Sequence, residues 1–211
     1  MSESVAARRL GILLSGRGSN FLAIADAVAA GGIPNAEIAV VASNRGEAPG
    51  IAAARSRGLP AEVVEAKGRG RAAHDAEMVE RLHAHGVELV CLAGYMRLLS
   101  PGFVQAFPNH ILNIHPSLLP AFPGLDAQRQ ALEYGALVSG CTVHFVDDQL
   151  DHGVIVLQRT VEVLPADDET ALSARILEQE HLAYPEAIAR VLSGKYRIAG
   201  RRYVAAPAER S

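Results

Sequence analysis

Leu10-Gly11-Ile12-Leu13-Leu14-Ser15-Gly16-Arg17-Gly18-Ser19-Asn20 joins an apolar run to a glycine-rich turn. The run at residues 10–14 is typical of a strand buried in a sheet, and residues 21–28 follow it with the apolar spacing of a helix. A buried strand that passes through a turn into a helix is the opening of a βαβ unit. The stretch therefore predicts an α/β fold whose first strand ends at this turn.

The same turn is a candidate anion-binding loop. Glycines let backbone N–H groups approach an anion, and the start of a helix favours negative charge. Ser19 and Asn20 would cap the helix or add donors. The dinucleotide and Walker patterns both need residues that this stretch lacks, so the loop suits a single phosphate. An ordinary tight turn between strand and helix is the alternative.

Apolar runs alternate with helical patterns through the first half of the chain. The predicted strands are residues 10–14, 38–41, 61–64 and 87–93, and the predicted helices are residues 21–30, 49–57 and 72–85. Such alternation implies parallel strands joined by right-handed crossovers.

The second half of the chain changes character. Residues 138–146 and 154–163 are β-branched runs close in sequence, which favours an antiparallel pair. A last helix is expected after Thr170, and Pro185 is expected to kink or divide it. Residues 194–211 are expected to form a short strand or an extended tail.

The fold class that these patterns predict is α/β, with one domain over residues 1–211. Its central sheet is mostly parallel and flanked by helices, and its C-terminal part is antiparallel. Residues 1–8 and 205–211 are expected to be flexible tails.

Asn113-Ile114-His115-Pro116-Ser117-Leu118-Leu119-Pro120 is the first candidate for chemistry. If residues 111–115 are extended, Asn113 and His115 share one face, because side chains alternate along a strand. The residue before each proline is biased towards extended backbone, which places the pair at a strand end running into a rigid loop. An amide donor beside an imidazole suits a developing oxyanion. The alternative is that both side chains only bind loop backbone.

An acidic loop follows the strand-like run that ends at Val146. It contains Asp147, Asp148 and Asp151, and Gly153 lets the chain turn sharply. A carboxylate in such a loop can approach an imidazole on another strand and favours its charged form. A solvated hairpin turn is the alternative.

Composition argues against several classes of function. The 211 residues are 49% hydrophobic, yet no apolar run approaches the length of a membrane span. The formal net charge of −3 comes without a basic stripe, so nucleic acid is not an expected partner. The chain starts without a signal-peptide pattern. Cys91 and Cys141 show no metal-binding spacing, and we expect a cytoplasmic protein.

Two further segments complete a pattern, namely Ala93-Gly94-Tyr95-Met96-Arg97-Leu98-Leu99-Ser100, and His144-Phe145-Val146 followed by Leu150-Asp151. Together with the glycine-rich turn and the Asn113 segment, they resemble the phosphoribosylglycinamide formyltransferase family, from about Arg9 to Tyr203. The resemblance implies a single-domain Rossmann-like formyltransferase fold. It also implies transfer of a formyl group from 10-formyltetrahydrofolate to glycinamide ribonucleotide (GAR) in de novo purine biosynthesis.

The resemblance also implies a set of site residues. The catalytic trio would be Asn113, His115 and Asp151. Contacts to GAR would come from Gly18, Ser19, Asn20 and Glu180. Contacts to the folate would come from Arg71, Met96, Arg97, Leu98, Leu99 and Asn113. The expected partners are GAR and the formyl folate, which serves as a co-substrate, with no membrane partner and with a monomeric or homodimeric protein.

The mechanism that the resemblance implies is direct transfer. The substrate amine attacks the formyl carbon, and Asn113 and a charged His115 stabilise the oxyanion. Asp151 favours the charged His115 and orients a water that carries protons to the leaving nitrogen. Cys91 lies in an apolar run and is expected to be an inert strand residue.

A few positions depart from the commoner family pattern. Arg17 replaces a small polar residue between the glycines, Asp126-Ala127-Gln128 stands where histidines are frequent, and His152 replaces a glycine. None of them belongs to the trio.

No metal is expected. His83 and His85 do not face each other at a spacing of two on a helix. A second set has ligand chemistry, namely His115, His144, Asp151 and His152, but the family needs no metal and His144 is expected to line the site or the core.

Three other functions remain open at this point. A formyltetrahydrofolate hydrolase would use the same trio with water, but is expected to carry an extra N-terminal domain. A methionyl-tRNA formyltransferase is expected to add a C-terminal RNA-binding domain and a basic face. A non-catalytic binding module would keep both pockets, although the intact trio argues against lost chemistry.

Overall fold

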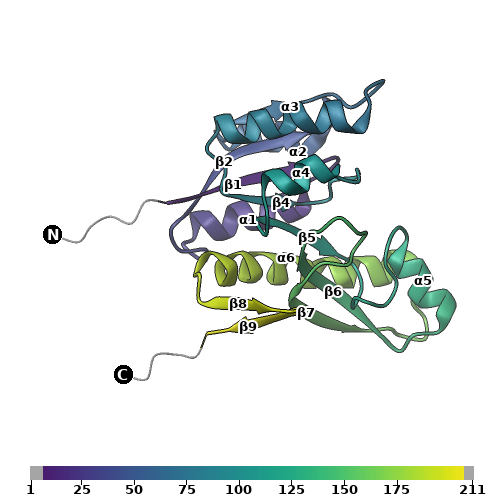
Figure 1. The fold of residues 1–211 in the computed structure, drawn as a ribbon. Helices are drawn as coiled ribbons and strands as arrows, with labels where there is room; N and C mark the ends of the chain where they lie inside the picture. The colour runs from purple at the N-terminus through teal and green to yellow at the C-terminus, as the bar shows by residue number, and fades with distance from the viewer. Residues whose placement is uncertain (1–6, 207–211) are drawn as a thin grey trace.

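The computed structural model describes residues 7–206, and nine strands within them form one sheet (Figure 1). The strands are β1 (Arg8–Leu14), β2 (Ala36–Ser43), β3 (Ala61–Val63), β4 (Leu89–Leu92), β5 (Ile111–His115), β6 (Val138–Phe145), β7 (Ile155–Glu162), β8 (Tyr196–Ala199) and β9 (Arg202–Ala205). Their order across the sheet is β3-β2-β1-β4-β5-β6-β7-β9-β8.

The first five strands run parallel, and β1 lies between β2 and β4. The direction then reverses, because β6 is antiparallel to β5 and β7 is antiparallel to β6. The hairpin of β8 and β9 joins β7 through a parallel contact between Ile155 and Arg202. The predicted α/β fold, with a mostly parallel sheet and an antiparallel C-terminal part, is confirmed.

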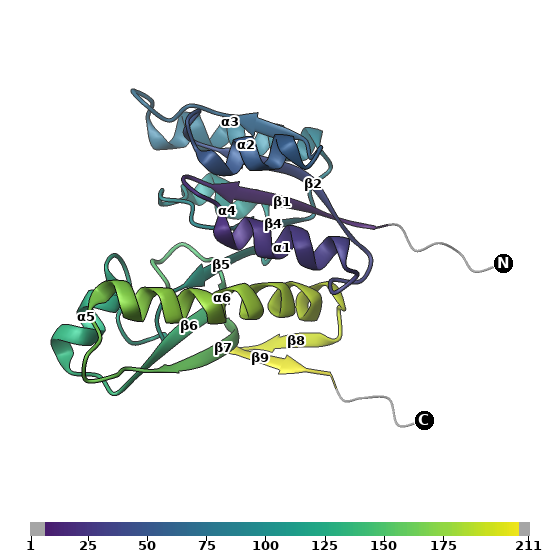
Figure 2. The same ribbon diagram turned by 180° about the vertical axis from the view of Figure 1, so that it is seen from behind.

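Helices cover both faces of the sheet (Figures 1 and 2). They are α1 (Ser19–Ala29), α2 (Pro49–Ser56), α3 (Arg71–Ala84), α4 (Pro101–Ala106), α5 (Ala127–Tyr134) and α6 (Glu169–Leu192). One hydrophobic cluster joins α1, α2 and α6 to the sheet, and another joins α3 and α4 to its other face.

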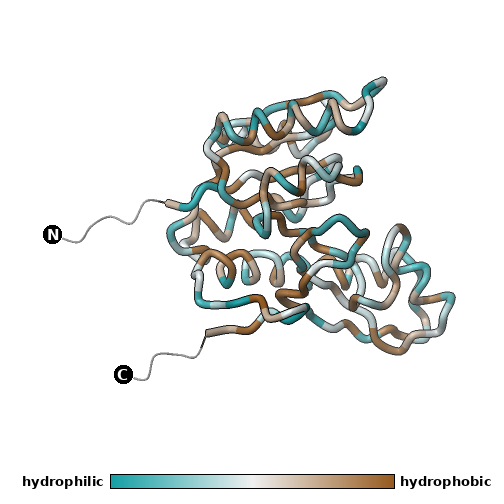
Figure 3. Tube along the Cα trace, viewed as in Figure 1, coloured by the Kyte–Doolittle hydropathy of each residue, from teal (hydrophilic) through white to brown (hydrophobic). Residues whose placement is uncertain are grey.

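Alternation along the strands explains these two clusters. In β1, Ile12 and Leu14 belong to the cluster under α1, α2 and α6, whereas Leu13 belongs to the cluster under α3 and α4, as a strand with a side-chain period of two requires. Figure 3 shows hydrophobic residues along these inner strands. A strand buried on both faces carries apolar residues at successive positions, which is why residues 10–14 read as an unbroken apolar run.

Helix α6 is continuous through Pro185, so the expectation that this proline divides the helix is wrong. Proline removes one backbone donor from a helix interior. Ala183, Tyr184, Ala187 and Ile188, which flank it, are fully buried against the sheet. Packing of this face favours the helical conformation over the local preference of proline.

The sheet extends into both stretches expected to be tails. Arg8 begins β1 and Ala205 ends β9, so these two residues belong to the fold. Residues 1–6 and 207–211 of the predicted tails lie outside the described residues.

Candidate active site

The topology creates a switch point at the carboxyl ends of β1 and β4. The chain leaves β1 towards β2 on one side and later returns to β4 on the other, and ligands of open α/β sheets bind at such a switch point. The glycine-rich turn follows β1 here, and its first residue Ser15 donates its backbone N–H to Gly94 O at 3.0 Å, just after β4. Strand β5 ends beside β4 at the same edge.

Asn113 and His115 lie on the last three residues of β5, where the sequence placed them. The register with β6 pairs Asn113 with His144 and His115 with Thr142. Residues directly opposite on antiparallel strands point to the same face. Asn113, His115 and His144 therefore converge on one side of the sheet.

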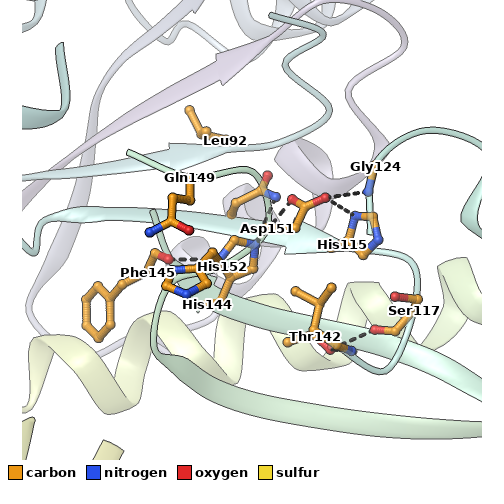
Figure 4. Close-up of polar contacts among 12 residues, drawn as sticks. Leu92, His115, Ser117, Gly124, Thr142, His144, Phe145, Gln149, Asp151 and His152 are labelled. Carbon is orange, nitrogen blue, oxygen red and sulfur yellow. Dashed lines mark hydrogen bonds and ion pairs between the residues drawn. The ribbon is translucent and has the colours of Figure 1, made fainter. Parts of the chain in front are cut away.

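Asp151 reaches this group from the loop between β6 and β7 (Figure 4). Its Oδ2 lies 3.4 Å from His115 Nδ1 and its Oδ1 lies 3.7 Å from His144 Nε2. The carboxylate also accepts a hydrogen bond from the Gly124 N–H at 2.8 Å. The structure thus brings Asn113, His115 and Asp151 together, and their side chains come from two separate parts of the chain.

His115 is buried and both of its ring nitrogens face oxygens. Nε2 lies 2.9 Å from the carbonyl of Phe122, and Nδ1 faces Asp151. A protonated ring nitrogen on either side has an oxygen acceptor within reach. This arrangement puts an imidazole next to the Asn113 amide.

His144 is held differently. Its Nδ1 donates to Phe145 O at 2.8 Å, and its Nε2 lies 3.2 Å from Asn113 Nδ2. Burial lowers the pKa of His144 below its ordinary value, although the Phe145 carbonyl and Asp151 act in the opposite direction. A neutral ring with its proton on Nδ1 satisfies both contacts.

The glycine-rich turn leads directly into α1. Gly18 precedes the helix with φ 75°, a left-handed conformation that glycine adopts without strain. No side chain caps α1, so the capping role considered for Ser19 and Asn20 is wrong, because both residues already lie in the first turn of the helix. Their position leaves the backbone N–H groups at the start of α1 without a side-chain cap, at the end of the glycine-rich turn.

Asn20 and Glu180 form a buried pair between α1 and α6. Asn20 Nδ2 donates to Glu180 Oε2 at 2.7 Å, although the two residues are 160 positions apart. Burial raises the pKa of Glu180, and the Asn20 hydrogen bond partly offsets that effect. Asn20 Oδ1 is buried and has no partner among the described residues, which leaves an acceptor for a ligand at the end of β1.

The folate-side segment, residues 93–100, connects β4 to α4 and is anchored at both ends. The Met96 N–H donates to Ser15 Oγ at 2.8 Å, and the Ser100 N–H donates to Asp75 Oδ2 at 2.6 Å. Within this segment the side chains of Met96 and Leu98 are 65% and 58% exposed. Two large apolar side chains held out on a fixed loop offer a surface for an apolar ring system.

Three expected folate contacts differ in their surroundings. Leu99 is partly buried against the cluster under α3 and α4. Arg97 Nε is buried and has no hydrogen-bond partner within residues 7–206. Arg71 is exposed at the first position of α3, a helix that starts from the carboxyl side of β3. The structure therefore places Arg71 at the carboxyl edge of the sheet, exposed and without a contact that joins it to the trio.

The cysteines and the histidines outside the trio were further candidates for chemistry. Cys91 and Cys141 are both buried and free, and burial raises the pKa of each thiol. Residues 7–206 contain no group of three or more His, Cys, Asp or Glu side chains that could hold a metal ion. His85 instead contacts Glu62, with Nε2 and Oε1 2.7 Å apart.

Sequence reasoning assigned no role to Ser15, Asp75 or Gly124, which position the segments around the trio. It expected His144 to line the site or the core, and the structure has this buried ring in contact with Asn113. The pattern of residues 138–146 predicts a strand, which places the His144 side chain on one of its two faces. The register that faces it towards Asn113 depends on the intervening residues 116–137.

Fold and site together define a doubly wound α/β protein with an amide, an imidazole and a carboxylate at its switch point. Comparison with known proteins agrees, since the formyl transferase family matches residues 8–188. The phosphoribosylglycinamide formyltransferase of Escherichia coli (strain K12) is 41% identical over 188 residues, which are 89% of this chain and 88% of that protein. The chain belongs to the formyl transferase family.

Other relatives extend the comparison. The crystal structure of glycinamide ribonucleotide transformylase 1 from Symbiobacterium toebii superimposes with a TM-score of 0.93 at 50% identity, over 97% of this chain and 99% of that one. The trifunctional purine biosynthetic protein adenosine-3 of Drosophila pseudoobscura pseudoobscura is 46% identical over 193 residues. The chain spans only 14% of the length of that relative.

Proposed function

We propose that the protein transfers the formyl group of 10-formyltetrahydrofolate to the amine of GAR, giving formyl-GAR and tetrahydrofolate in purine biosynthesis. One observation carries the proposal. Asn113, His115 and Asp151 converge at the switch point of a formyl transferase fold, with Asp151 Oδ2 3.4 Å from His115 Nδ1.

In the proposed reaction the GAR amine attacks the formyl carbon of the folate. A carbon–nitrogen bond forms, and the carbonyl oxygen becomes an oxyanion. Asn113 donates an amide hydrogen to this oxygen, and His115 donates from Nδ1. The Nδ1–Asp151 separation of 3.4 Å is longer than the 2.9 Å from Nε2 to Phe122 O, so Nδ1–H is the proton more easily shared with a substrate oxygen.

Collapse of the intermediate breaks the bond to the folate nitrogen. The proton lost by the amine passes to that nitrogen through a water oriented by Asp151. No covalent intermediate with the protein is needed, and the buried thiol of Cys91 takes no part. The reaction thus depends on donors fixed before the charge develops, which is the main source of stabilisation in acyl transfer.

The two substrates are proposed to bind on opposite sides of the trio. The GAR phosphate is held by Gly18, Ser19 and Asn20, because the backbone N–H groups at the start of α1 are donors for an anion. Glu180 contacts the nucleotide. The folate is contacted by Asn113 and by Arg71, Met96, Arg97, Leu98 and Leu99. Figure 1 places the start of α1 and the end of β4 at the same edge of the sheet.

We also propose a cytoplasmic location and a monomeric or homodimeric protein. Two buried free cysteines suit a reducing compartment. Among the helices of residues 7–206, none has the length and apolar character that crossing a membrane needs.

Substitution within the trio tests this proposal. His115→Ala and Asp151→Asn should each lose most of the turnover, by about 10²-fold or more, because a positioned donor or its partner is removed. Steady-state kinetics with both substrates measures the loss, and circular dichroism checks that each variant folds. Asp148→Asn is the matched control, because Asp148 lies in the same loop but is exposed. Near-normal turnover of either trio variant contradicts the assignment.

A further inference from the structure

His144 is the buried titratable side chain closest to the trio that the proposed mechanism leaves without a task. It lies on β6 directly opposite Asn113 and is 2% exposed. Its two ring nitrogens contact different groups, one on the backbone and one on the Asn113 amide. These two contacts decide which way the amide points.

The backbone contact fixes the tautomer of the ring. Nδ1 lies 2.8 Å from the carbonyl oxygen of Phe145, and a carbonyl can only accept. The ring proton must therefore lie on Nδ1, and a neutral ring then has a bare Nε2 that can only accept. Gly153 preserves this carbonyl position, since a Cβ on Gly153 would come within 1.8 Å of Phe145 O.

The tautomer in turn fixes the Asn113 amide. An accepting Nε2 requires a donor, so the NH₂ group of Asn113, and not its oxygen, must face His144, at 3.2 Å. One N–H of this group is bound to the ring. The second N–H remains available for the formyl oxygen.

We propose that His144 is a positioning residue that holds Asn113 with its amide hydrogens at the reacting oxygen. The proposal rests on the function proposed above, because it gives Asn113 an oxyanion to stabilise. If the amide turned by half a rotation, Asn113 would present its carbonyl oxygen to the developing negative charge. That orientation repels the charge that the site must stabilise.

The charge state of His144 matters for the same reason. A proton on Nε2 would make the ring a donor to Asp151 Oδ1, which is 3.7 Å away, and would turn the Asn113 amide around. The ionisable groups that face His144 are Asp151 and Asp147 from the following loop and His115 from β5. The two carboxylates favour the charged ring, whereas burial and His115 oppose it, and burial is the largest influence on the pKa of His144.

A kinetic experiment tests the positioning role. His144→Phe keeps the ring shape but removes the acceptor, and it should lower kcat by about 10²-fold with small changes in KM, close to the loss in Asn113→Ala. His144→Gln, whose amide oxygen can accept from Asn113, should recover most of the activity. His110→Phe is the control, because His110 is exposed and lies just before β5, at the end of the strand away from the trio.

A double-mutant cycle separates this role from a general loss of structure. If His144 acts through Asn113, the double variant His144→Phe/Asn113→Ala should be no slower than Asn113→Ala alone. Additive losses would overturn the proposal, and so would normal kcat in His144→Phe. If the wild-type protein shows no turnover that depends on GAR, the proposed function is wrong, and the inference that rests on it is wrong as well.

Nuclear magnetic resonance of the wild-type protein gives a readout that does not depend on activity or on a variant folding. Long-range proton–nitrogen correlations of the imidazoles should show His144 neutral at pH 7, with its proton on Nδ1. A charged His144 or a proton on Nε2 would overturn the proposal.

Discussion

At the scale of single residues, side chains in this site are held by partners far away in sequence. Asn20 is bound by Glu180 from α6, His115 faces Asp151 from the loop after β6, and Asn113 contacts His144 on β6. Such contacts form only when the whole sheet is assembled. The chemistry of each side chain is therefore set by the fold and not by its neighbours along the chain.

Glu180 gives a prediction about pH and stability. Burial raises its pKa above the usual 4.5, so between these two values the folded protein binds more protons than the unfolded chain. Stability then falls as pH rises through this window. The free energy of unfolding of Glu180→Gln minus that of the wild type should therefore increase from pH 4.5 upward. Urea unfolding across this range measures it.

Glu178→Gln is the control for this experiment, because Glu178 lies exposed on the same helix. Its difference from the wild type should stay flat with pH. A flat difference for Glu180→Gln as well would contradict the assigned cause.

At the scale of elements, the folate-side segment at residues 93–100 depends on anchors from other elements. Ser15 Oγ accepts from the Met96 N–H and donates to Asn44 Oδ1 at 2.6 Å. Ser15 therefore connects the glycine-rich turn, the end of β2 and the segment proposed to bind the folate. A substitution at Ser15 should therefore alter the conformation of residues 93–100.

Ser15→Ala should destabilise the protein by about 1–3 kcal/mol, because it leaves two buried polar groups without a partner. It should also raise KM for the formyl folate several-fold while kcat changes little, since the trio is untouched. Urea unfolding and steady-state kinetics measure the two effects. Ser56→Ala, on the exposed end of α2, should change neither. An unchanged KM in Ser15→Ala would show that this anchor does not shape the folate side.

The sequence predicted those elements whose pattern is local. Alternating runs and helical spacing placed the parallel strands, and the period of two along β5 put Asn113 and His115 on one face. Pro185 was judged by its local preference, whereas burial of the α6 residues around it keeps the helix continuous. His144 facing Asn113 was not predictable, because strand register across the 22 residues between β5 and β6 is a tertiary property.

At the scale of the whole molecule, α6 packs against β5 in the parallel part of the sheet and against β6 and β7 in the antiparallel part. Tyr184 on this helix donates its hydroxyl to the carbonyls of both Leu92 and Leu112, at 3.1 and 2.9 Å. These residues lie in β4 and β5, the strands that lead into the site. The same helix carries Glu180 towards the glycine-rich turn.

Tyr184→Phe should lower the free energy of unfolding by about 1–2 kcal/mol, because a fully buried hydroxyl donor is removed. The substitution should also lower kcat measurably, because β4 and β5 lead into the site. Tyr134→Phe is the matched control, since Tyr134 is 81% exposed. Equal stability of the two variants would contradict a bridging role for Tyr184.

The formyl transfer itself is tested most directly with a spectrophotometric assay of a 10-formylfolate donor, run with and without GAR. The account predicts that the deformylated folate product appears only when GAR is present. Product formed at the same rate without GAR would indicate a hydrolase. No product under either condition would contradict a catalytic role for Asn113, His115 and Asp151.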